Sequence, residues 1–572
     1  MSQLERMLEQ LDELKRPSGD PRARSRMEKL LSGLARRRLT DAASLVRFHE
    51  ILLFVRAYPQ SASLVRQAER LLSNFHERVG ELEASGAKDL YLLEAPDASG
   101  IAGTTLLANF SYDILRDISA RHPSQFSVVW EDYGEQWRFA SVMSRFLPLV
   151  EENVYVETYF PLTEWLLAAQ GVRDARRLDL AWILERFERL PLPEKERADL
   201  FDSLKLWVRW EFGNSPITRT RMRRRSGALF YHDAPLLTRR DVSLDSEVEA
   251  AEPLPFDKLS HTQARTLIDA GRDTMAMRFR ELHGFMYADA RRVWRAAVGR
   301  GVEIFIWGVE PERRLPSLAY HALLIFKNGV PAGYAEALTL FERAEVGLNL
   351  YYTFREGESG WIYARLLRLL RQFLGVKVFS VDPYQLGHHN AEGLASGAFW
   401  FYRKLGFRPV QKALAARTLA EERKLTARPG YRTSRRILEQ LSSGHVLYET
   451  PTAERGAWDN FHIRNLGLAV QRRMAARFGG DADKMRRAST RSVARALGLN
   501  VERLKDDERQ AFTNLSLLLA LIPDLSRWPQ HDKQQLRRII RAKAAPDESD
   551  YVRLLQNHKR LRREIIRMGD GG

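Results

Sequence analysis

The stretch that decides the fold begins at Tyr320 and reads YHALLIFKNGVPAGYAEALTLFERAEVGLNLYYTFREGESGWIYARLLRLLRQFLGVKVFSVDPY to residue 384; it closes with SGAFWFYRKLGFRP at residues 396–409. Asn328-Gly329 divides two apolar segments, and because this dipeptide favours positive φ it predicts a tight hairpin between two strands. Residues 345–354 then alternate between apolar and polar, which predicts a third strand.

A helix and a fourth strand follow this hairpin. Apolar residues of helical period from Ile362 to Phe373 predict a helix, and Gly375 is placed to end it. VKVFSVDPY, residues 376–384, predicts the fourth strand, and an aromatic helix from Phe399 to Leu405 completes the stretch. Upstream, EIFIWGV at residues 303–309 predicts the first strand of the same sheet, after helices expected over residues 260–300.

The stretch resembles the core of the GNAT superfamily of N-acetyltransferases. The resemblance is carried by Phe401-Tyr402-Arg403-Lys404-Leu405-Gly406-Phe407 and by the strand, loop and helix over residues 348–373. It implies an α/β (α+β) fold in which a mixed β-sheet has helices on both faces. It also implies acetyl-CoA or another acyl-CoA as co-substrate, with Tyr402 as general acid.

In this family the loop after the strand holds the cofactor pyrophosphate on backbone N–H groups, a role suited to the positive end of a helix. The residues that the resemblance assigns to cofactor binding are Leu350, Tyr352, Arg355, Gly357, Ser359, Gly360 and Trp361. Only Gly360 stands in register with the glycines of the family pattern. Glu358 replaces the other glycine, and we expect Glu358→Gly to tighten binding by removing a like charge.

Acyl transfer to an amine also needs a polarised carbonyl and a proton acceptor. Backbone N–H groups around Leu350–Tyr352 are candidates for the first role. Glu336 and Glu345 are candidate bases, against the simpler interpretation that each is an exposed acid of a strand. His388-His389 lacks a third ligand at metal-binding spacing, so no metal is expected; His321 is interpreted as structural.

Composition bounds the class of protein. The chain has 572 residues, a net charge of +17 and no cysteine, which excludes disulfides and thiol nucleophiles and fits a reducing cytoplasm. The charged N-terminus does not resemble a secretory signal, and no apolar run is long enough to predict a membrane span. Residues 411–572 hold 33 Lys and Arg against 19 Asp and Glu, which favours an anionic partner for this part.

Five segments are expected. Residues 1–90 are interpreted as a helical module, and residues 91–240 as a mixed, aromatic-rich, mainly helical domain with a short strand at 89–95. Residues 241–256, acidic with two prolines, are interpreted as a linker. Residues 257–410 form the GNAT-like domain, and residues 411–572 a basic helical C-terminal domain, in which HVLYET at 445–450 is a possible strand.

Three further patterns bear on partners and core. The aromatic residues Trp130, Tyr155, Tyr159 and Trp210 predict a core of large side chains. The basic run at residues 218–226 indicates either phosphate contact or a solvated surface. SVARALGL at residues 492–499, followed by a loop and a helix, weakly resembles a DNA-binding helix-turn-helix.

Two functions remain open at this point. The first is an acyl-CoA-dependent N-acyltransferase acting on an amine of a protein or nucleic-acid-associated substrate. The second is a catalytically inactive member of the same fold, used as a binding or scaffold protein. In either case the partners expected for residues 411–572 are nucleic acid or an acidic protein.

Overall fold

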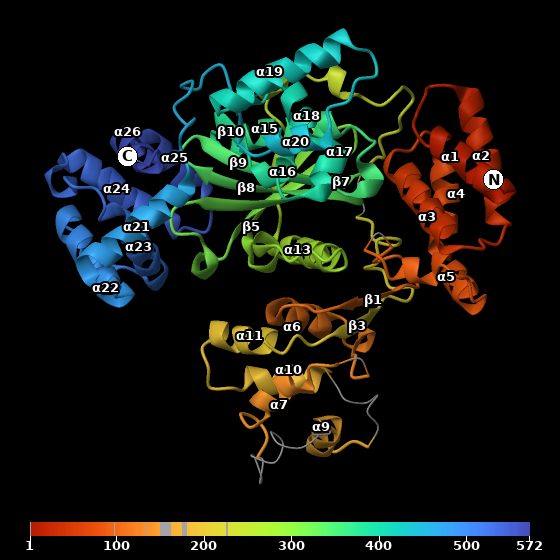
Figure 1. Cartoon of the computed structure of the whole chain (residues 1–572), viewed down its shortest axis with the longest axis horizontal. Coiled ribbons are helices and arrows are strands. Elements are labelled where there is room, and N and C mark those ends of the chain that lie inside the picture. Colours follow the sequence, from red (N-terminus) through yellow and green to blue (C-terminus); the bar gives the residue numbers. More distant parts are fainter. Residues whose placement is uncertain are drawn as a thin grey trace. The chain divides into compact units, whose positions relative to one another are not determined.

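The computed structural model describes residues 2–96, 98–131, 133–148, 162–173, 180–224 and 227–571. It contains both helices and mixed β-sheet (Figure 1), and the chain divides into two compact units. Unit 1 comprises residues 1–235, 266–286 and 328–331; unit 2 comprises residues 236–265, 287–327 and 332–572. Among the described residues, none of the helices combines the length and the apolar character needed to cross a membrane.

Unit 1 is mainly helical and contains a small antiparallel sheet of order β1-β3-β2. Its elements are α1 Gln3–Leu14, α2 Pro21–Ala35, α3 Ala42–Ala57, α4 Ala62–Ser73, α5 Phe75–Ala84, β1 Thr105–Ala108, α6 Tyr112–Arg121, β2 Phe126–Val128, α7 Gln136–Met143, α9 Leu162–Gln170, α10 Leu180–Glu188, α11 Glu194–Asp202, β3 Val208–Glu211 and α14 His283–Met286. α13 His261–Ala276 begins in unit 2 and ends in unit 1. The strand predicted at residues 89–95 is wrong: Leu90–Leu93 is a 3-10 helix.

Some of the aromatic residues of unit 1 are buried in its core, and others are exposed. Trp130 and Trp210 are buried, as predicted, whereas Trp137 and Trp207 are exposed. Tyr155 and Tyr159 lie outside the described residues. The predicted core of large side chains is therefore confirmed for the buried members only.

The basic run at 218–226 is engaged within unit 1. The Arg219 side chain pairs with Glu50, and Arg223 Nη1 lies 2.6 Å from Glu69 Oε1. Arg221 donates to the Ser73 carbonyl at 3.0 Å. Residues 225 and 226 lie outside the described residues. These contacts give Arg219, Arg221 and Arg223 structural partners.

Unit 2 is built on a nine-stranded sheet of order β11-β12-β10-β9-β8-β7-β6-β5-β4. Its elements are α12 Leu244–Val248, β4 Phe256–Lys258, β5 Ala288–Gly299, β6 Val302–Val309, β7 Ala319–Lys327, β8 Val330–Leu340, β9 Arg343–Leu350, α15 Ser359–Leu374, β10 Val378–Val381, α16 Pro383–Leu386, α17 Ala391–Ser396, α18 Ala398–Leu405, β11 Arg408–Pro409, α19 Lys412–Ala427, α20 Arg435–Leu441, β12 Val446–Glu449, α21 Ile463–Phe478, α22 Ala482–Leu497, α23 Asp506–Leu519, α24 Gln530–Lys543, α25 Ser549–Asn557 and α26 Lys559–Gly569.

The local signals of the sequence are confirmed in this sheet. Asn328 and Gly329 both have positive φ, 49° and 78°, in the turn between β7 and β8. Gly375 ends α15 with φ 73° and Gly406 ends α18 with φ 116°. The third strand is shorter than predicted: β9 ends at Leu350, and residues 352–354 form a 3-10 helix instead.

Two predictions around the start of the sheet are wrong. Residues 260–300 are not all helical, because β5 occupies Ala288–Gly299. The strand predicted first, at 303–309, is preceded by β4 and β5. A hairpin between β5 and β6, with positive φ at Arg300 and Gly301, explains the difference.

The segment at residues 241–256 is part of unit 2, where it packs against the main core and is not an open linker. Leu244, Val248 and Leu254 are buried in the main core, and Glu247 lies 2.9 Å from Arg368 Nη1 of α15. Two of its acidic side chains, Glu247 and Glu249, thus pair with arginines of α15.

The basic C-terminal residues belong to the same unit as the sheet, although they were expected to form a separate domain. β12 lies between β10 and β11, antiparallel to both. α25 lies close to the end of α15, where Gln556 Nε2 donates to the Leu374 carbonyl at 2.8 Å. Figure 1 shows α21 to α26 gathered beside the large sheet.

Candidate functional site

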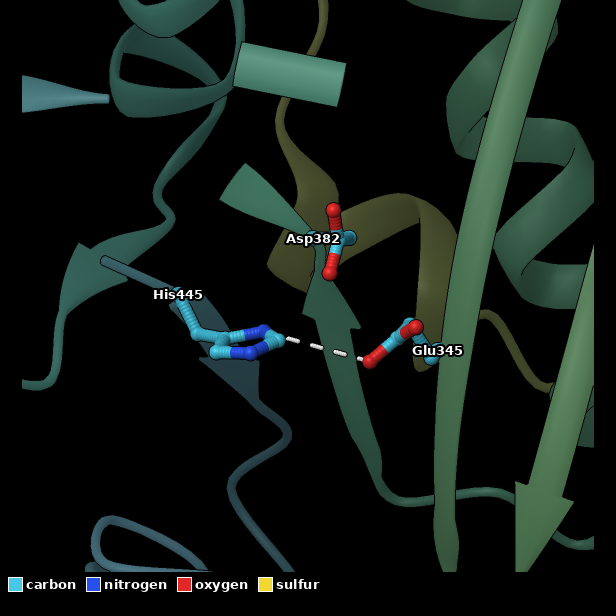
Figure 2. A group of neighbouring side chains, drawn as sticks. All are labelled: Glu345, Asp382 and His445. Atoms are coloured by element: carbon cyan, nitrogen blue, oxygen red, sulfur yellow. Dashed lines mark ion pairs between the residues drawn. The ribbon is translucent and has the colours of Figure 1, made fainter. Parts of the chain in front are cut away.

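Three titratable side chains meet where β9 and β10 stop pairing. The parallel β9–β10 ladder ends at Glu345 and Ser380. Asp382 follows the last residue of β10, and His445 precedes β12, whose Val446 pairs with Val381. One ligand-type atom from each of Glu345, Asp382 and His445 lies within 4.8 Å of the others, and Figure 2 shows the three side chains facing one another.

Burial and a nearby arginine set the protonation of this trio. Burial raises the pKa of Glu345, and Arg343, whose Nη2 lies 3.3 Å from Glu345 Oε2, opposes that rise. Burial and, to a smaller extent, the positive charge of Arg343 lower the pKa of His445 to about 4. The imidazole is therefore neutral near pH 7. Its Nδ1 lies 3.9 Å from Glu345 Oε2 and has no hydrogen-bond partner among the described residues.

Two backbone N–H groups of β9 are directed toward the side where its pairing with β10 has ended. Tyr351 N–H donates to the Ala332 carbonyl of β8 at 3.0 Å. Because successive residues of a strand alternate sides, the N–H groups of Leu348 and Leu350 point away from β8, toward the side of β10. The β9–β10 ladder has already ended there. Of the N–H groups predicted to polarise a carbonyl, Leu350 is suitably directed and Tyr351 is not.

Glu336 and Glu345 share one face of the sheet. Leu338 pairs with Glu345 across β8 and β9, so Glu336, two residues before Leu338, lies diagonally from Glu345 on the same face. The Tyr320 hydroxyl donates to Glu336. Glu336 is half-buried. The two carboxylates are thus near neighbours on this face, with Leu338 opposite Glu345.

Tyr402 is in the interior of unit 2. Its ring, on α18, packs edge-on against Tyr363 of α15 at 5.4 Å and against Phe407 at 5.6 Å. It is 4 % exposed, and burial raises its pKa, so the phenol stays protonated at physiological pH. No hydrogen bond to its hydroxyl occurs within the described parts of the chain.

The loop predicted to bind pyrophosphate is closed by other parts of unit 2. A Cβ on Gly360 would meet the Cα of Arg239 at 3.4 Å, so the segment around Arg239 covers the first turn of α15. Trp361 is buried in the main core. The Gly357 N–H donates to the Phe354 carbonyl at 3.0 Å. Ser359 is half-buried in the first turn.

The remaining residues of the predicted cofactor set also face elsewhere. The Arg355 guanidinium donates to the Leu350 carbonyl at 3.1 Å and pairs with Glu392. Tyr352 is exposed, with 73 % of its surface accessible. The structure does not bring these residues into one phosphate cradle.

Glu358 has a role that the sequence did not indicate. It is fully buried; its Oε2 accepts from Lys327 Nζ at 3.2 Å and its Oε1 accepts from Arg300 Nε at 2.8 Å. Leu237 N–H also donates to it, at 3.2 Å. The premise behind the expectation for Glu358→Gly, an uncompensated carboxylate in an open loop, does not hold, because the carboxylate is paired with two cations in the interior.

The trio also has the donor types of a cation site, two carboxylates and an imidazole. Arg343 already places a positive charge beside Glu345, so a metal ion is not required to compensate the carboxylate. The sequence did not predict this grouping. Its three members come from separated segments of the chain and therefore show no metal-ligand spacing.

Comparisons of the chain with protein-family models, with curated proteins and with solved structures found no match. The site is thus described by its own geometry.

Sequence reasoning named Glu345 but missed Asp382 and His445. The available signal was positional: each stands at the end of a strand-like apolar run, Asp382 after VFSV and His445 before VLYE. Polar residues at strand ends meet only when the strand order places those ends together, and the sequence does not show that order.

Proposed function

We propose that unit 2 is an acyl-CoA-dependent N-acyltransferase that acts where the pairing of β9 and β10 ends. The observation that carries this proposal is the convergence of Glu345, Asp382 and His445 where the β9–β10 ladder ends. The strand order supports the proposal. β12, the last strand along the chain, lies between β10 and β11 and extends the mixed sheet that the resemblance to acetyltransferases implies. The amine acceptor would approach along the face shared by Glu336 and Glu345.

The chemistry assigns one role to each group. The amine nitrogen attacks the thioester carbonyl, its proton passes to the Glu345 carboxylate, and the C–S bond breaks. The raised pKa of Glu345 makes it a better proton acceptor than an ordinary carboxylate. His445, which is neutral near pH 7, lies beside it. Leu348 and Leu350 N–H groups stabilise the oxyanion.

The leaving thiolate needs a proton, and Tyr402 is our candidate donor. Its raised pKa keeps the phenol protonated, and its hydroxyl is not held by another group among the described residues. Since the first turn of α15 is covered, the phosphates of the acyl-CoA are assigned to residues outside that turn.

A second candidate function rests on that same covered turn. Glu358, buried between Lys327 and Arg300, and the Arg239 segment over Gly360 fill the place where family members hold pyrophosphate. This favours a binding or scaffold protein that uses the fold without acyl-CoA.

A thiol-release assay separates the two functions. Full-length protein with acetyl-CoA and a panel of primary amines should release free CoA, and because the chain contains no cysteine a thiol reagent gives no protein background. Glu345→Gln should slow release by about 10²-fold or more, since it removes the proton acceptor.

The matched control is Glu439→Gln, which makes the same change at an exposed acid paired with Arg435 on α20. It should leave the rate unchanged. Calorimetry of the full-length protein with millimolar acetyl-CoA completes the test. A folded protein that gives neither binding heat nor CoA release would leave the binding or scaffold function.

A further inference from the structure

A hollow lined by arginines lies at the turn that joins α22 to α23. It has a volume of about 470 Å³, and α24 forms one wall. Its polar lining consists of Asn500, Arg503, Gln534, Arg537, Arg538 and Arg541. This is the part of the chain in which the sequence weakly suggested a helix-turn-helix.

The charge of this hollow is uncompensated within its walls. Its lining, drawn from the described residues, includes four arginines and no carboxylate. Arg537 Nη1 donates to the Leu497 carbonyl at 2.8 Å, which fixes that guanidinium at the end of α22. Two exposed arginines elsewhere in unit 2, by contrast, each lie beside an acid of their own segment: Arg527 beside Asp524 and Arg567 beside Glu564.

The arginines form a strip along α24. Gln534, Arg537, Arg538 and Arg541 are spaced i, i+3, i+4 and i+7, so they share one helix face, whereas Leu536, Ile539 and Ile540 are buried on the other. Seven residues of helix span roughly 10 Å. The strip is long enough to meet more than one phosphate of an extended chain.

We propose that this hollow, with the α24 strip, binds the phosphate backbone of a nucleic acid. Guanidinium groups present paired donors that match phosphate oxygens, and clustering them without carboxylates raises the local positive potential. The excess of 33 Lys and Arg over 19 Asp and Glu in residues 411–572 supplies a long-range attraction for a polyanion. Because the binding groups meet phosphates, affinity should not depend on base sequence.

The test measures binding of full-length protein to a fluorescent 20-base-pair DNA duplex and to a single-stranded RNA, by anisotropy, over a series of salt concentrations. Log Kd should vary linearly with log salt. In the triple variant Arg503→Gln, Arg538→Gln, Arg541→Gln, the slope should shrink by roughly 0.9 for each phosphate that the protein no longer neutralises, up to about 2.7 in total. Arg537 is kept because its hydrogen bond supports the turn.

The control removes the same charge from arginines that are paired with acids. Arg435→Gln, Arg527→Gln and Arg567→Gln together should leave the slope close to that of the wild type. Circular dichroism melting confirms that both triple variants fold. Equal weakening in both variants, or no binding by the wild type, would overturn the proposal. So would displacement of the duplex by inorganic pyrophosphate at equal phosphate concentration, which would indicate a site for small anions. None of these readouts involves acyl transfer.

Discussion

Glu358 is a buried carboxylate that accepts hydrogen bonds from two cationic side chains. In the sequence it is a carboxylate in a loop expected to attract anions. In the structure it is buried with Lys327 and Arg300, and removing it would take away the carboxylate that accepts from the buried ammonium. Breaking a buried pair from one side typically costs about 3–5 kcal/mol, so Glu358 is a residue of the fold.

Lys327 gives this arrangement a pH signature. Burial lowers its pKa from 10.5 to about 8, although Glu358 opposes the shift. Between these values the unfolded chain binds a proton that the folded chain has released, so the free energy of unfolding rises with pH across this window. The free-energy cost of burying the charged ammonium is fully present below about pH 8.

We therefore expect the wild type to gain stability relative to Lys327→Met as pH rises from 8 to 10.5, by up to about 3 kcal/mol. Urea unfolding of both proteins at several pH values measures the difference. If the free energies of unfolding of the two proteins change in parallel between pH 8 and 10.5, the folded protein does not lower the pKa of Lys327.

Tyr402→Phe separates a catalytic hydroxyl from a structural one. The substitution keeps the packing of the ring against Tyr363 and Phe407 and removes only the oxygen. Because no described group bonds that oxygen, melting temperature should stay nearly constant, while CoA release slows by roughly 10²-fold if Tyr402 protonates the thiolate. Unchanged release with saturating acyl-CoA would remove Tyr402 from the mechanism.

At the scale of elements, α12 acts as part of the core. Its two buried apolar residues, Leu244 and Val248, pack in the cluster that includes α15, and its Glu247 pairs with Arg365 and Arg368 of that helix. A short acidic helix thus covers the basic side of α15 and joins it to the sheet.

We expect Leu244→Ala with Val248→Ala to destabilise unit 2 by several kcal/mol, since a buried Leu→Ala alone costs about 2–5 kcal/mol. Denaturant unfolding provides the measurement. Asp257→Ala, at an exposed position of the neighbouring strand β4, is the control and should change stability little. A double variant as stable as the wild type would restore the interpretation of residues 241–256 as a linker.

At the scale of the whole molecule, the C-terminal third completes unit 2. β12 supplies the strand between β10 and β11, and Arg562 of α26 donates from Nε to Glu342 at 2.9 and 3.0 Å. Arg314 donates to the Lys543 carbonyl at 2.6 Å. A chain that ends at residue 410 has none of these interactions.

Truncation after residue 410 should therefore leave unit 2 unfolded or aggregated, because β10 and β11 would be left with unpaired edges. Size-exclusion chromatography and circular dichroism of the truncated protein test this. A monomer with a cooperative melt would show that residues 411–572 are an independent domain, as the charge distribution suggested.

The sequence by itself determined the features that depend on neighbouring residues. Asn328-Gly329 sets a turn through positive φ, Gly375 and Gly406 end helices, and the apolar period of 362–373 sets the buried face of α15. Each is a preference of a few consecutive residues, so it can be recognised without knowledge of the rest of the chain.

Tertiary structure alone decided which side chains meet. Glu345 was named from the sequence. Asp382 and His445 lie beside it because β12, which is far from β10 along the chain, pairs with β10 in the sheet. Glu358 likewise found its partners on β7 and on the β5–β6 turn. Pairing across a sheet is set by burial of apolar faces over the whole unit, and no local pattern encodes the order in which distant strands come together.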